Sequence, residues 1–248
     1  MKQFRRVRDL LKLHLQGEDG RLGTVQELYF DDQTGAVRYV VVRTGGWLLG
    51  HDVLIAPMAI DRIDDTDGSL HTHLRKEQIE QAPPIEKAKP ISRQYEENYF
   101  RHFGWAPYWQ AGPAIWGGAV PFPERPTMSV DQPPVGRPPE QSHLRSSAEV
   151  TGYGVHAKDG DIGHIEDLVV DDHEWMVRYV EVDTRNWLPG KQVLVPIGRI
   201  TKIDWHNRSV SMSLTRQAIQ SAPPYDPSQL ITPDYEVQLF TYYGTEGG

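Results

Sequence analysis

Cysteine is absent from this chain of 248 residues. Disulfide bridges, thiolate zinc sites and cysteine nucleophiles are therefore excluded, and the absence is typical of a reducing compartment. Long apolar runs are missing too, because no uninterrupted stretch approaches the roughly 18–20 residues that span a bilayer. The basic start of the chain precedes an apolar run, Leu10–Leu15, that is too short for a signal peptide and is interrupted by charge. We therefore expect a soluble, cytoplasmic protein without a transmembrane segment.

The chain also lacks an excess of positive charge. It has 26 lysines and arginines against 34 aspartates and glutamates, which gives a formal net charge of −8 at pH 7. Phosphate binding needs a concentrated basic surface, and no such basic run occurs in the sequence. We therefore expect no nucleic-acid partner, and the acidity mainly favours solubility.

What the chain does contain is one sequence that occurs twice. Residues 19–104, here the first repeat, align without a gap on residues 159–244, the second repeat, and about a third of the aligned positions are identical. We predict two related domains, residues 1–104 and 148–248, joined by a linker at 105–147. The shared positions include Asp19-Gly20, Gly23, Asp31-Asp32, Val37–Val40, Trp47-Leu48, Ala82–Pro84 and Tyr95-Glu96 of the first repeat.

Each repeat has the pattern of several short strands. The turn between the last two of them contains Asp67-Gly68, a step that favours the positive φ angles of tight hairpins. Short strands with regular turns predict a small antiparallel barrel or curled sheet, since closing a sheet removes its exposed edges. The β-forming runs of the first repeat lie at residues 22–30, 37–43, 51–56, 60–64 and 69–74.

One segment in each repeat has helix-forming composition. It covers residues 74–81 and 214–221, and a Pro-Pro pair follows each copy. The residues beyond the prolines predict an extended tail. The predicted fold is therefore all-β, with two tandem antiparallel barrels, each followed by a short helix and an extended tail, and with a linker rich in proline and aromatic residues between them.

A succession of turn glycines and apolar strands resembles the PRC-barrel domain. This barrel occurs in the cytoplasmic part of the photosynthetic reaction-centre H subunit and in the ribosome maturation factor. The resemblance implies an adaptor-type barrel without shared catalytic residues, so no active-site position carries over, and it implies a link to reaction-centre-like assemblies. The residues that carry it are Leu22-Gly23, Asp31-Asp32, Val37–Val42, Trp47–Gly50 and Val53–Pro57, with Asp159–Asp167 and Asn186–Lys191 in the second repeat.

The linker has two parts of different composition. Residues 126–147 are polar and rich in proline, which is typical of an extended solvated spacer. Residues 99–123 carry many aromatic rings, which are costly to leave in water. We expect these rings to cover the barrels, to seal a domain or dimer interface, or to bind an outside protein.

Tryptophans and one tyrosine are the predicted partner-binding residues, because aromatic residues dominate binding hot spots. Two of the tryptophans occupy equivalent positions in the repeats, where an indole could instead cap the barrel end with its N–H on a carbonyl. The six residues are Trp105, Tyr108, Trp109, Trp116, Trp47 and Trp187.

Other candidate chemistry has weak support. The aspartates between Asp61 and Gly68 do not have EF-hand spacing, and His71 and His73 are serines in the second repeat. The adjacent pairs Asp31-Asp32 and Asp171-Asp172 fit turns better than acid–base catalysis. We therefore predict no catalytic residues, no metal site and no cofactor.

The sequence thus predicts a non-enzymatic protein-interaction or scaffold module, with a homodimer left open. The alternative is a small-molecule or metal-responsive protein with a ligand site between the two barrels. The polar residues that this alternative would use are Tyr95, Glu96, His102, Tyr235 and Glu236.

Overall fold

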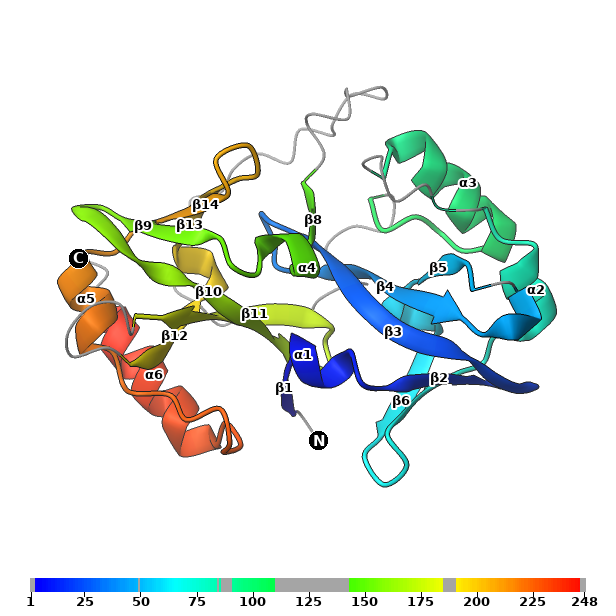
Figure 1. The fold of residues 1–248 in the computed structure, drawn as a ribbon, viewed down its shortest axis with the longest axis horizontal. Helices are drawn as coiled ribbons and strands as arrows, with labels where there is room; N and C mark the ends of the chain where they lie inside the picture. The colour runs from blue at the N-terminus through cyan, green and yellow to red at the C-terminus, as the bar shows by residue number, and fades with distance from the viewer. Residues whose placement is uncertain are drawn as a thin grey trace. The chain divides into compact units, whose positions relative to one another are not determined.

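The computed structural model describes residues 3–48, 50–83, 85, 91–109, 143–184 and 191–245. Within these residues the fold is mostly β with short helices (Figure 1), as predicted. Two of the predicted partner-binding residues, Trp116 and Trp187, lie outside the described residues.

The first repeat forms one sheet with the strand order β5-β4-β3-β2-β7-β6. An additional short strand, β8 (Leu144–Ser146), pairs with β3. The pairs along this order for which the register is described are antiparallel except one, since β2 and β7 run parallel. The prediction of a purely antiparallel sheet is therefore wrong at this pair. β2 lies before residue 19, where the alignment of the two repeats begins, and no strand was predicted there. The strands are β2 (His14–Gly17), β3 (Gly20–Asp31), β4 (Val37–Thr44), β5 (Asp52–Ile55), β6 (Ile60–Asp64) and β7 (Ser69–Thr72).

The second repeat forms a separate sheet of equivalent topology. Its strand order is β12-β11-β10-β9-β14-β13, again with one parallel pair, β9 with β14. Here the additional strand is β1 (Phe4–Arg6), which pairs antiparallel with β10. Its strands are β9 (Gly154–Ala157), β10 (Gly160–Asp171), β11 (Met176–Asp183), β12 (Gln192–Pro196), β13 (Ile200–Asp204) and β14 (Ser209–Met212).

The repeated Asp-Gly pairs have a structural reason. Asp19 accepts a hydrogen bond from the backbone N–H of Lys76, 3.1 Å away, at the start of α2 (Lys76–Glu80). Asp159 accepts one from Arg216, 2.7 Å away, at the start of α5 (Arg216–Ser221). The glycine after each aspartate has a φ of 122° or 132°, which only glycine adopts readily. Each pair thus joins the turn before a strand to the start of the short helix.

The tails contain helices, so the prediction of extended tails is wrong. In the first repeat, α3 (Arg93–Phe103) begins at Ser92, whose hydroxyl accepts from the N–H of Tyr95, and ends at Gly104 with φ 69°. In the second repeat, α6 covers Pro233–Thr245. The capping residue and the four-residue spacing of apolar positions are helix signals that the prediction of extended tails overlooked. Two shorter helices, α1 (Val7–Leu10) and α4 (Ser147–Val150), follow β1 and β8, and 3₁₀ turns lie at Gly46–Leu48, Pro57–Ala59 and Ile197–Arg199.

The chain divides into two compact units that are not continuous in sequence. The composite unit contains Met1–Lys12, Glu27–Val37 and Arg145–Gly248, and the first-repeat unit contains Leu13–Gln26 and Arg38–Leu144. The segment boundaries predicted from the sequence stay a prediction. Each unit has an apolar core; its members are at most 2% exposed and include Leu22, Val42, Ile55 and Leu70 in the first-repeat unit, and Ile165, Val180, Val195 and Val210 in the composite unit.

The composite unit joins equivalent segments of both repeats. Arg5 forms an ion pair with Asp172 at 2.7 Å, and Arg145 forms one with Asp32 at 2.8 Å. The two arginines are 140 positions apart in the sequence, and so are the two aspartates, which makes both ion pairs equivalent. Nearby, a β-bridge links Ala36 to its own equivalent, Met176. The duplication therefore extends to the arms before each repeat, β1 with α1 and β8 with α4, although their sequences show it only weakly.

A tyrosine anchors each tail helix to its sheet. Tyr99 of α3 donates to the carbonyl of Leu54, and Tyr243 of α6 donates to the carbonyl of Leu194, at 3.1 and 2.8 Å. The two carbonyls are equivalent in the repeats, but the two tyrosines are not, since they differ by one helical turn. The same anchor has thus been kept on two different helix positions.

Replacing Tyr243 with phenylalanine is expected to lower the free energy of unfolding by about 1–2 kcal/mol. The ring stays in place, and the buried carbonyl of Leu194 loses its donor. Urea unfolding measures the loss. Tyr242→Phe is the comparison on the same helix: its hydroxyl also donates to a carbonyl, that of Ala218 at 2.7 Å, but this residue is partly exposed, so we expect a smaller loss. An equal loss in both variants would contradict an effect of the buried anchor.

Candidate functional site

Residues Trp105–Trp109, here called the aromatic segment, follow α3 and pack against that helix. Trp105 stacks on Phe103 with ring centroids 4.6 Å apart, and Tyr108 and Trp109 meet Phe100 edge-on at 6.0 and 5.5 Å. Phe100 is consequently only 1% exposed. Three predicted partner-binding residues thus have intramolecular contacts within the first-repeat unit, and each remains partly exposed. Their binding to a partner stays a prediction.

A buried carboxylate holds this segment in place. Glu96 accepts hydrogen bonds from the hydroxyls of Tyr39 and Tyr108, both at 2.9 Å, and Arg93 lies 3.3 Å from its second oxygen. The guanidinium of Arg38 lies 3.9 Å from the centre of the Tyr108 ring. Burial raises the pKa of Glu96, while Arg93 and the two tyrosine hydroxyls oppose that rise. The carboxylate therefore acts as an internal anchor for the aromatic segment.

Replacing Trp109 with alanine is expected to lower the free energy of unfolding by about 1–3 kcal/mol. The substitution removes the ring contact with Phe100 and the stacking of Arg93, whose guanidinium carbon lies 4.0 Å from the indole centre. Thermal unfolding followed by near-UV circular dichroism measures the change. Trp205→Ala is the control, because that indole is 57% exposed, and a loss of more than about 0.5 kcal/mol there would show that removing any tryptophan destabilises the protein.

Trp47 has the capping role that its position allows. Its indole N–H donates to the carbonyl of Leu22 at 2.8 Å, and Lys76 lies 5.9 Å from the ring centre. The side chain is partly exposed. This contact accounts for the residue structurally, and a partner contact at the same ring stays a prediction.

The polar tail residues of the alternative ligand site make structural hydrogen bonds. Tyr95 and Tyr235 donate to equivalent carbonyls, those of Pro83 and Pro223, at 2.7 and 3.3 Å. His102 lies 3.0 Å from the carbonyl of Gln78. These contacts explain why the Ala-Pro-Pro sequence and the tail tyrosine recur together in both repeats.

The repeated aspartate pairs divide into two roles. Asp31 accepts from the backbone N–H groups of Gln33 and Thr34, and Asp171 accepts from those of His173 and Glu174. This confirms the prediction of turn chemistry for the first member of each pair. The second members, Asp32 and Asp172, hold the arms through Arg145 and Arg5.

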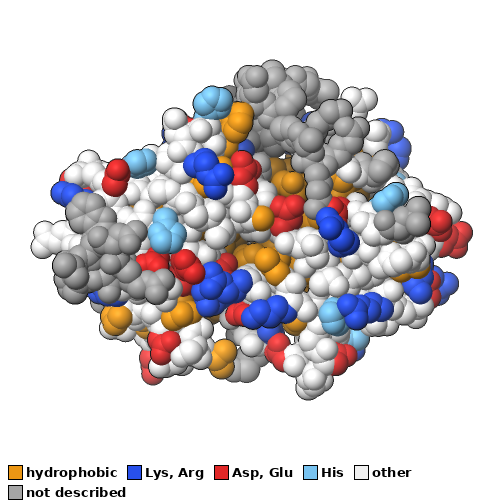
Figure 2. All heavy atoms as spheres, in the orientation of Figure 1, with side chains coloured by type: hydrophobic (Ala, Val, Ile, Leu, Met, Phe, Trp, Pro, Cys, Tyr) orange, Lys and Arg blue, Asp and Glu red, His pale blue; other side chains and the backbone are white. Residues whose placement is uncertain are grey.

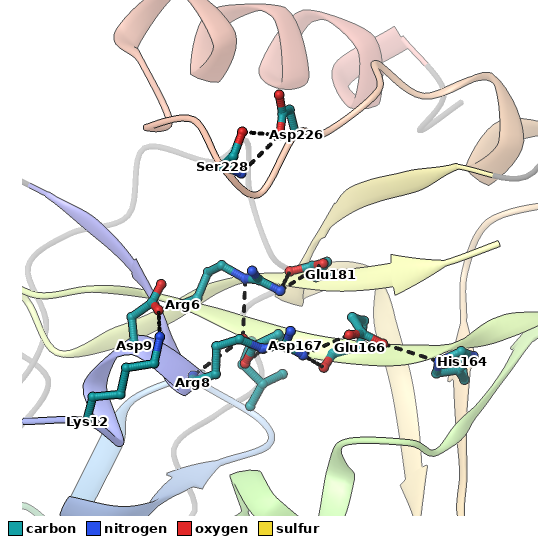
Figure 3. A network of polar contacts seen from close by, with 11 residues as sticks. Arg6, Arg8, Asp9, Lys12, His164, Glu166, Asp167, Glu181, Asp226 and Ser228 are labelled. Atoms are coloured by element: carbon teal, nitrogen blue, oxygen red, sulfur yellow. Dashed lines mark hydrogen bonds and ion pairs between the residues drawn. The ribbon is translucent and has the colours of Figure 1, made fainter. Parts of the chain in front are cut away.

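A charged network lies where the N-terminal arm meets β10 in the composite unit (Figure 3). Arg6 lies between two carboxylates, with Glu181 at 2.9 Å and Asp167 at 3.4 Å. Arg8 contacts Asp167 at 3.0 Å and Glu166 at 2.8 Å. Glu181 is completely buried and Asp167 is 3% exposed. Three of these residues, Arg6, Arg8 and Glu181, come from outside any recognised motif, so the sequence did not single them out.

Burial dominates the electrostatics of the two buried carboxylates. It raises the pKa of Glu181 to about 7, against the opposing charge of Arg6 and with a further rise from Asp167. Burial also raises the pKa of Asp167, opposed by a backbone hydrogen bond and by Arg6 and Arg8. The positions equivalent to Arg6 and Glu181 in the other copy are Ser146 and Val41, so this charged network is present in one copy only.

Two clusters of described residues have ligand atoms within 4.8 Å of one another, as a metal site would require. One contains Asp64, Asp67 and His71, whose imidazole also lies 2.7 Å from the Ser69 hydroxyl. The other contains His164, Glu166 and Asp183. In that second cluster Glu166 already pairs with Arg8 at 2.8 Å, which places an internal cation on the carboxylate. Carboxylate and imidazole are ligands for divalent transition metals.

The grooves of the described residues are open. One, of about 480 Å³, is lined by polar residues of the first repeat, among them Arg21, Thr24, Gln26 and Arg43. The equivalent positions in the second repeat include His164, Glu166 and Asp183, so the same place is basic in one copy and acidic in the other. A second groove, of about 640 Å³, lies in the composite unit beside α6 and includes Lys191 and Tyr242.

The C-terminal helix α6 carries apolar side chains on its exposed face. Val237 is 64% exposed and Phe240, one turn further, is 50% exposed. Leu230, just before the helix, is 74% exposed. The sequence analysis predicts an extended tail here and therefore does not predict which residues share an exposed helix face.

One face of the molecule is mixed in charge. Figure 2 shows lysine and arginine side chains interspersed with aspartate and glutamate on the face that it draws. In the described part of the chain, no helix has the length and apolar character needed to cross a membrane.

Two related β-sheets with short helices, each with an arm that pairs onto it, make this a β-rich protein built of a repeated small domain. The sequence profile of the PRC-barrel domain matches residues 2–79 and 146–210. The chain therefore belongs to the PRC-barrel family and carries this domain twice.

A protein of Deinococcus radiodurans, named only as uncharacterized, is similar to part of the chain. The two are 36% identical over 59 residues, which are 24% of this chain and 21% of that protein. The similarity thus spans about a fifth of the relative's length and carries no statement about activity.

Proposed function

We propose that this protein is a non-enzymatic protein-interaction or scaffold module built of two duplicated PRC-barrels. The observation that carries the proposal is the exposed apolar face of α6, where Val237 and Phe240 are 64% and 50% exposed. Apolar side chains grouped on an exposed helix face are typical of a protein-binding surface. A cytoplasmic location and a homodimer are further parts of the same proposal.

The use of the buried charges supports a binding rather than a catalytic role. Glu181 and Asp167 pair with arginines of the N-terminal arm, and Glu96 anchors the aromatic segment. A carboxylate with a raised pKa is a typical feature of a catalytic site, but here each one is committed to holding two segments of the chain together. The family resemblance to the reaction-centre H subunit extends the proposal to partners in reaction-centre-like assemblies.

Affinity capture from native cell extract, followed by mass spectrometry, tests the module. The full chain is compared with Val237→Glu, which places a charge on the exposed face of α6, and with Gln238→Glu, which adds the same charge at the next position of that helix. We expect a specific protein that the full chain and Gln238→Glu retain and that Val237→Glu loses at least tenfold. Equal recovery on all three proteins, or no specific protein on any of them, would contradict the proposal.

The alternative function is a metal-responsive protein, favoured by the His164, Glu166 and Asp183 cluster. Co²⁺ titration, followed by its visible absorption, separates this alternative from the module. The matched variant is His164→Thr, which introduces the residue of the first repeat. Saturable Co²⁺ binding that is lost in this variant would support the metal-responsive alternative.

A further inference from the structure

Each repeat receives the arm of the other repeat. The arm before the first repeat pairs with the second repeat, because β1 lies antiparallel to β10. The arm before the second repeat pairs with the first repeat, because β8 pairs with β3. The ion pairs follow the same exchange, since Arg5 contacts Asp172 at 2.7 Å and Arg145 contacts Asp32 at 2.8 Å. Each arm therefore packs on the repeat to which it does not belong in sequence.

Further contacts in the composite unit are reciprocal in the same way. The backbone N–H of Val37 donates to the carbonyl of Trp175 at 2.8 Å, and the N–H of Val177 donates to the carbonyl of Gly35 at 2.8 Å. Val177 is the equivalent of Val37, and Trp175 is the equivalent of Gly35. Reciprocal contacts between equivalent positions are the pattern of a two-fold symmetric dimer interface. The composite unit therefore contains, within one chain, contacts of the kind that join two subunits.

One reciprocal contact differs in charge between the copies. Arg6 of the first arm lies 3.4 Å from Asp167 and 2.9 Å from Glu181. The equivalent of Arg6 in the second arm is Ser146, whose hydroxyl donates to Glu27. A serine arm on the second repeat would leave two buried carboxylates without the arginine, which is costly because a buried charge needs an opposite charge. The charged network therefore disfavours pairing between two second repeats.

We infer that the arms are docking elements for a second copy of this chain: the arm before each repeat binds the complementary repeat of the other copy, and this forms an arm-exchanged homodimer. The inference rests on the proposed function, because it names the surface that forms the homodimer of that proposal. The same contacts join the repeats of a single chain, so the two forms differ in which chain supplies the arm. The connection between the repeats favours the single-chain form, since a tether gives the repeats a high effective concentration for each other.

The test uses the full chain with a protease recognition sequence inserted after Val135, in the predicted linker. The chain is cut after folding, so that each fragment carries one repeat with its own arm. Size-exclusion chromatography with light scattering, over a series of dilutions, measures whether the fragments stay together. Isotope-labelled and unlabelled cut proteins are then mixed, and native mass spectrometry measures exchange between copies. The same mixture of uncut chains, concentrated and then diluted, measures the homodimer itself.

We expect the fragments to stay together and to exchange between copies. Pairs of a first repeat with a second repeat should outnumber pairs of two second repeats at least about tenfold, because only the first arm carries the arginine. The mixture of uncut chains should contain a dimer with both labels.

Variants of one ion pair connect these associations to the arms. Arg5→Glu places a like charge opposite Asp172 and should weaken the pairing of fragments and the dimer at least about tenfold. Arg5→Glu combined with Asp172→Arg reverses the pair and should recover most of the loss. Lys12→Met is the matched control in the same arm, because Lys12 pairs with Asp9 of that arm and both side chains are exposed. Circular dichroism of the uncut variants checks folding, and Arg5→Gln, which adds no repulsion, replaces Arg5→Glu if that variant does not fold.

Several results would overturn the inference. Fragments of the unchanged chain that separate on cutting would show that the contacts are too weak to dock a second chain. Associations that Arg5→Glu and Arg5→Gln leave unchanged would show that the arms do not hold the repeats together. Fragments that exchange, without any mixed-label dimer of uncut chains, would confine the docking to the repeats of one chain. The extract capture is a separate measurement that depends on Val237, so loss of the homodimer would not by itself contradict the interaction module.

Discussion

Replacing Arg6 with methionine is expected to lower the free energy of unfolding by about 3–5 kcal/mol at pH 8. The guanidinium lies 2.9 Å from Glu181 and 3.4 Å from Asp167, and its removal leaves two buried carboxylates without this cation. Breaking a buried ion pair on one side is costly because the remaining charge is neither solvated nor paired. Urea unfolding of the full chain measures the loss.

The loss is expected to be smaller at pH 5 than at pH 8. Burial already raises the pKa of Glu181 to about 7 in the folded protein, above the ordinary value of 4.5. The folded state therefore keeps a proton that the unfolded state has released, and the stability that this group contributes falls as the pH rises from about 4.5 through 7. Without Arg6 the pKa of Glu181 rises further, so at pH 5 this carboxyl is neutral and the missing cation matters less.

Two controls accompany the Arg6 prediction. Lys12→Met removes a cation from an exposed pair with Asp9, whose side chains are 72% and 51% exposed, and should cost at most about 0.5 kcal/mol. The double variant Arg6→Met with Glu181→Val introduces the valine of the first repeat and should recover part of the loss, because one of the two stranded charges is gone. A loss in Arg6→Met that is the same at pH 5 and pH 8 would show that lost packing, and not the stranded charges, causes it.

Replacing Gly163 with alanine is expected to lower the free energy of unfolding by about 2–5 kcal/mol. A Cβ at this position would collide with the backbone carbonyl of Asp183, and the residue has a φ of 72°. The collision adds to the cost of the left-handed conformation, which is about 1–2 kcal/mol for a residue with a side chain. The atoms that the added Cβ would meet belong to the backbone of Asp183 and Thr184, which cannot move aside as easily as a flexible side chain.

Other glycines separate the two contributions. Gly23→Ala meets the equivalent carbonyl, that of Arg43, without a positive φ, and should therefore lose only the packing part. Gly198→Ala has no heavy atom within 4 Å of the added Cβ and should change the free energy of unfolding by less than about 0.5 kcal/mol. Urea unfolding of the three variants, compared with the unchanged chain, tests this order. A Gly163→Ala protein as stable as Gly198→Ala would contradict the predicted collision.

The duplication could be recognised from the sequence because equivalent residues keep the same spacing in both copies. Asp19-Gly20 and Asp159-Gly160 keep their distance to the short helices that they cap, at Lys76 and Arg216. The strands followed from runs of β-forming residues and from turn residues, which are local signals. β3 and β10, predicted from apolar runs, are both 12 residues long in the structure.

The tail helices were missed although their signals are local. Ser92 caps α3 and Gly104 ends it, but the repeated aromatic positions were interpreted as an extended tail. Once the helix is recognised, Val237 and Phe240 fall on one exposed face, and the candidate binding surface follows. This error therefore concealed the site as well as the fold.

The sequence by itself determined the two copies, most of the strands along each repeat and the family, because these depend on residue spacing and on turn chemistry. Only the tertiary structure decided that the arm containing Arg6 and Arg8 pairs with β10, more than 150 residues away, and that Phe100 is covered while Phe240 is exposed. Ion pairs and ring contacts between distant segments depend on where the backbone brings the side chains together. That placement is a property of the folded chain, and no local pattern in the sequence encodes it.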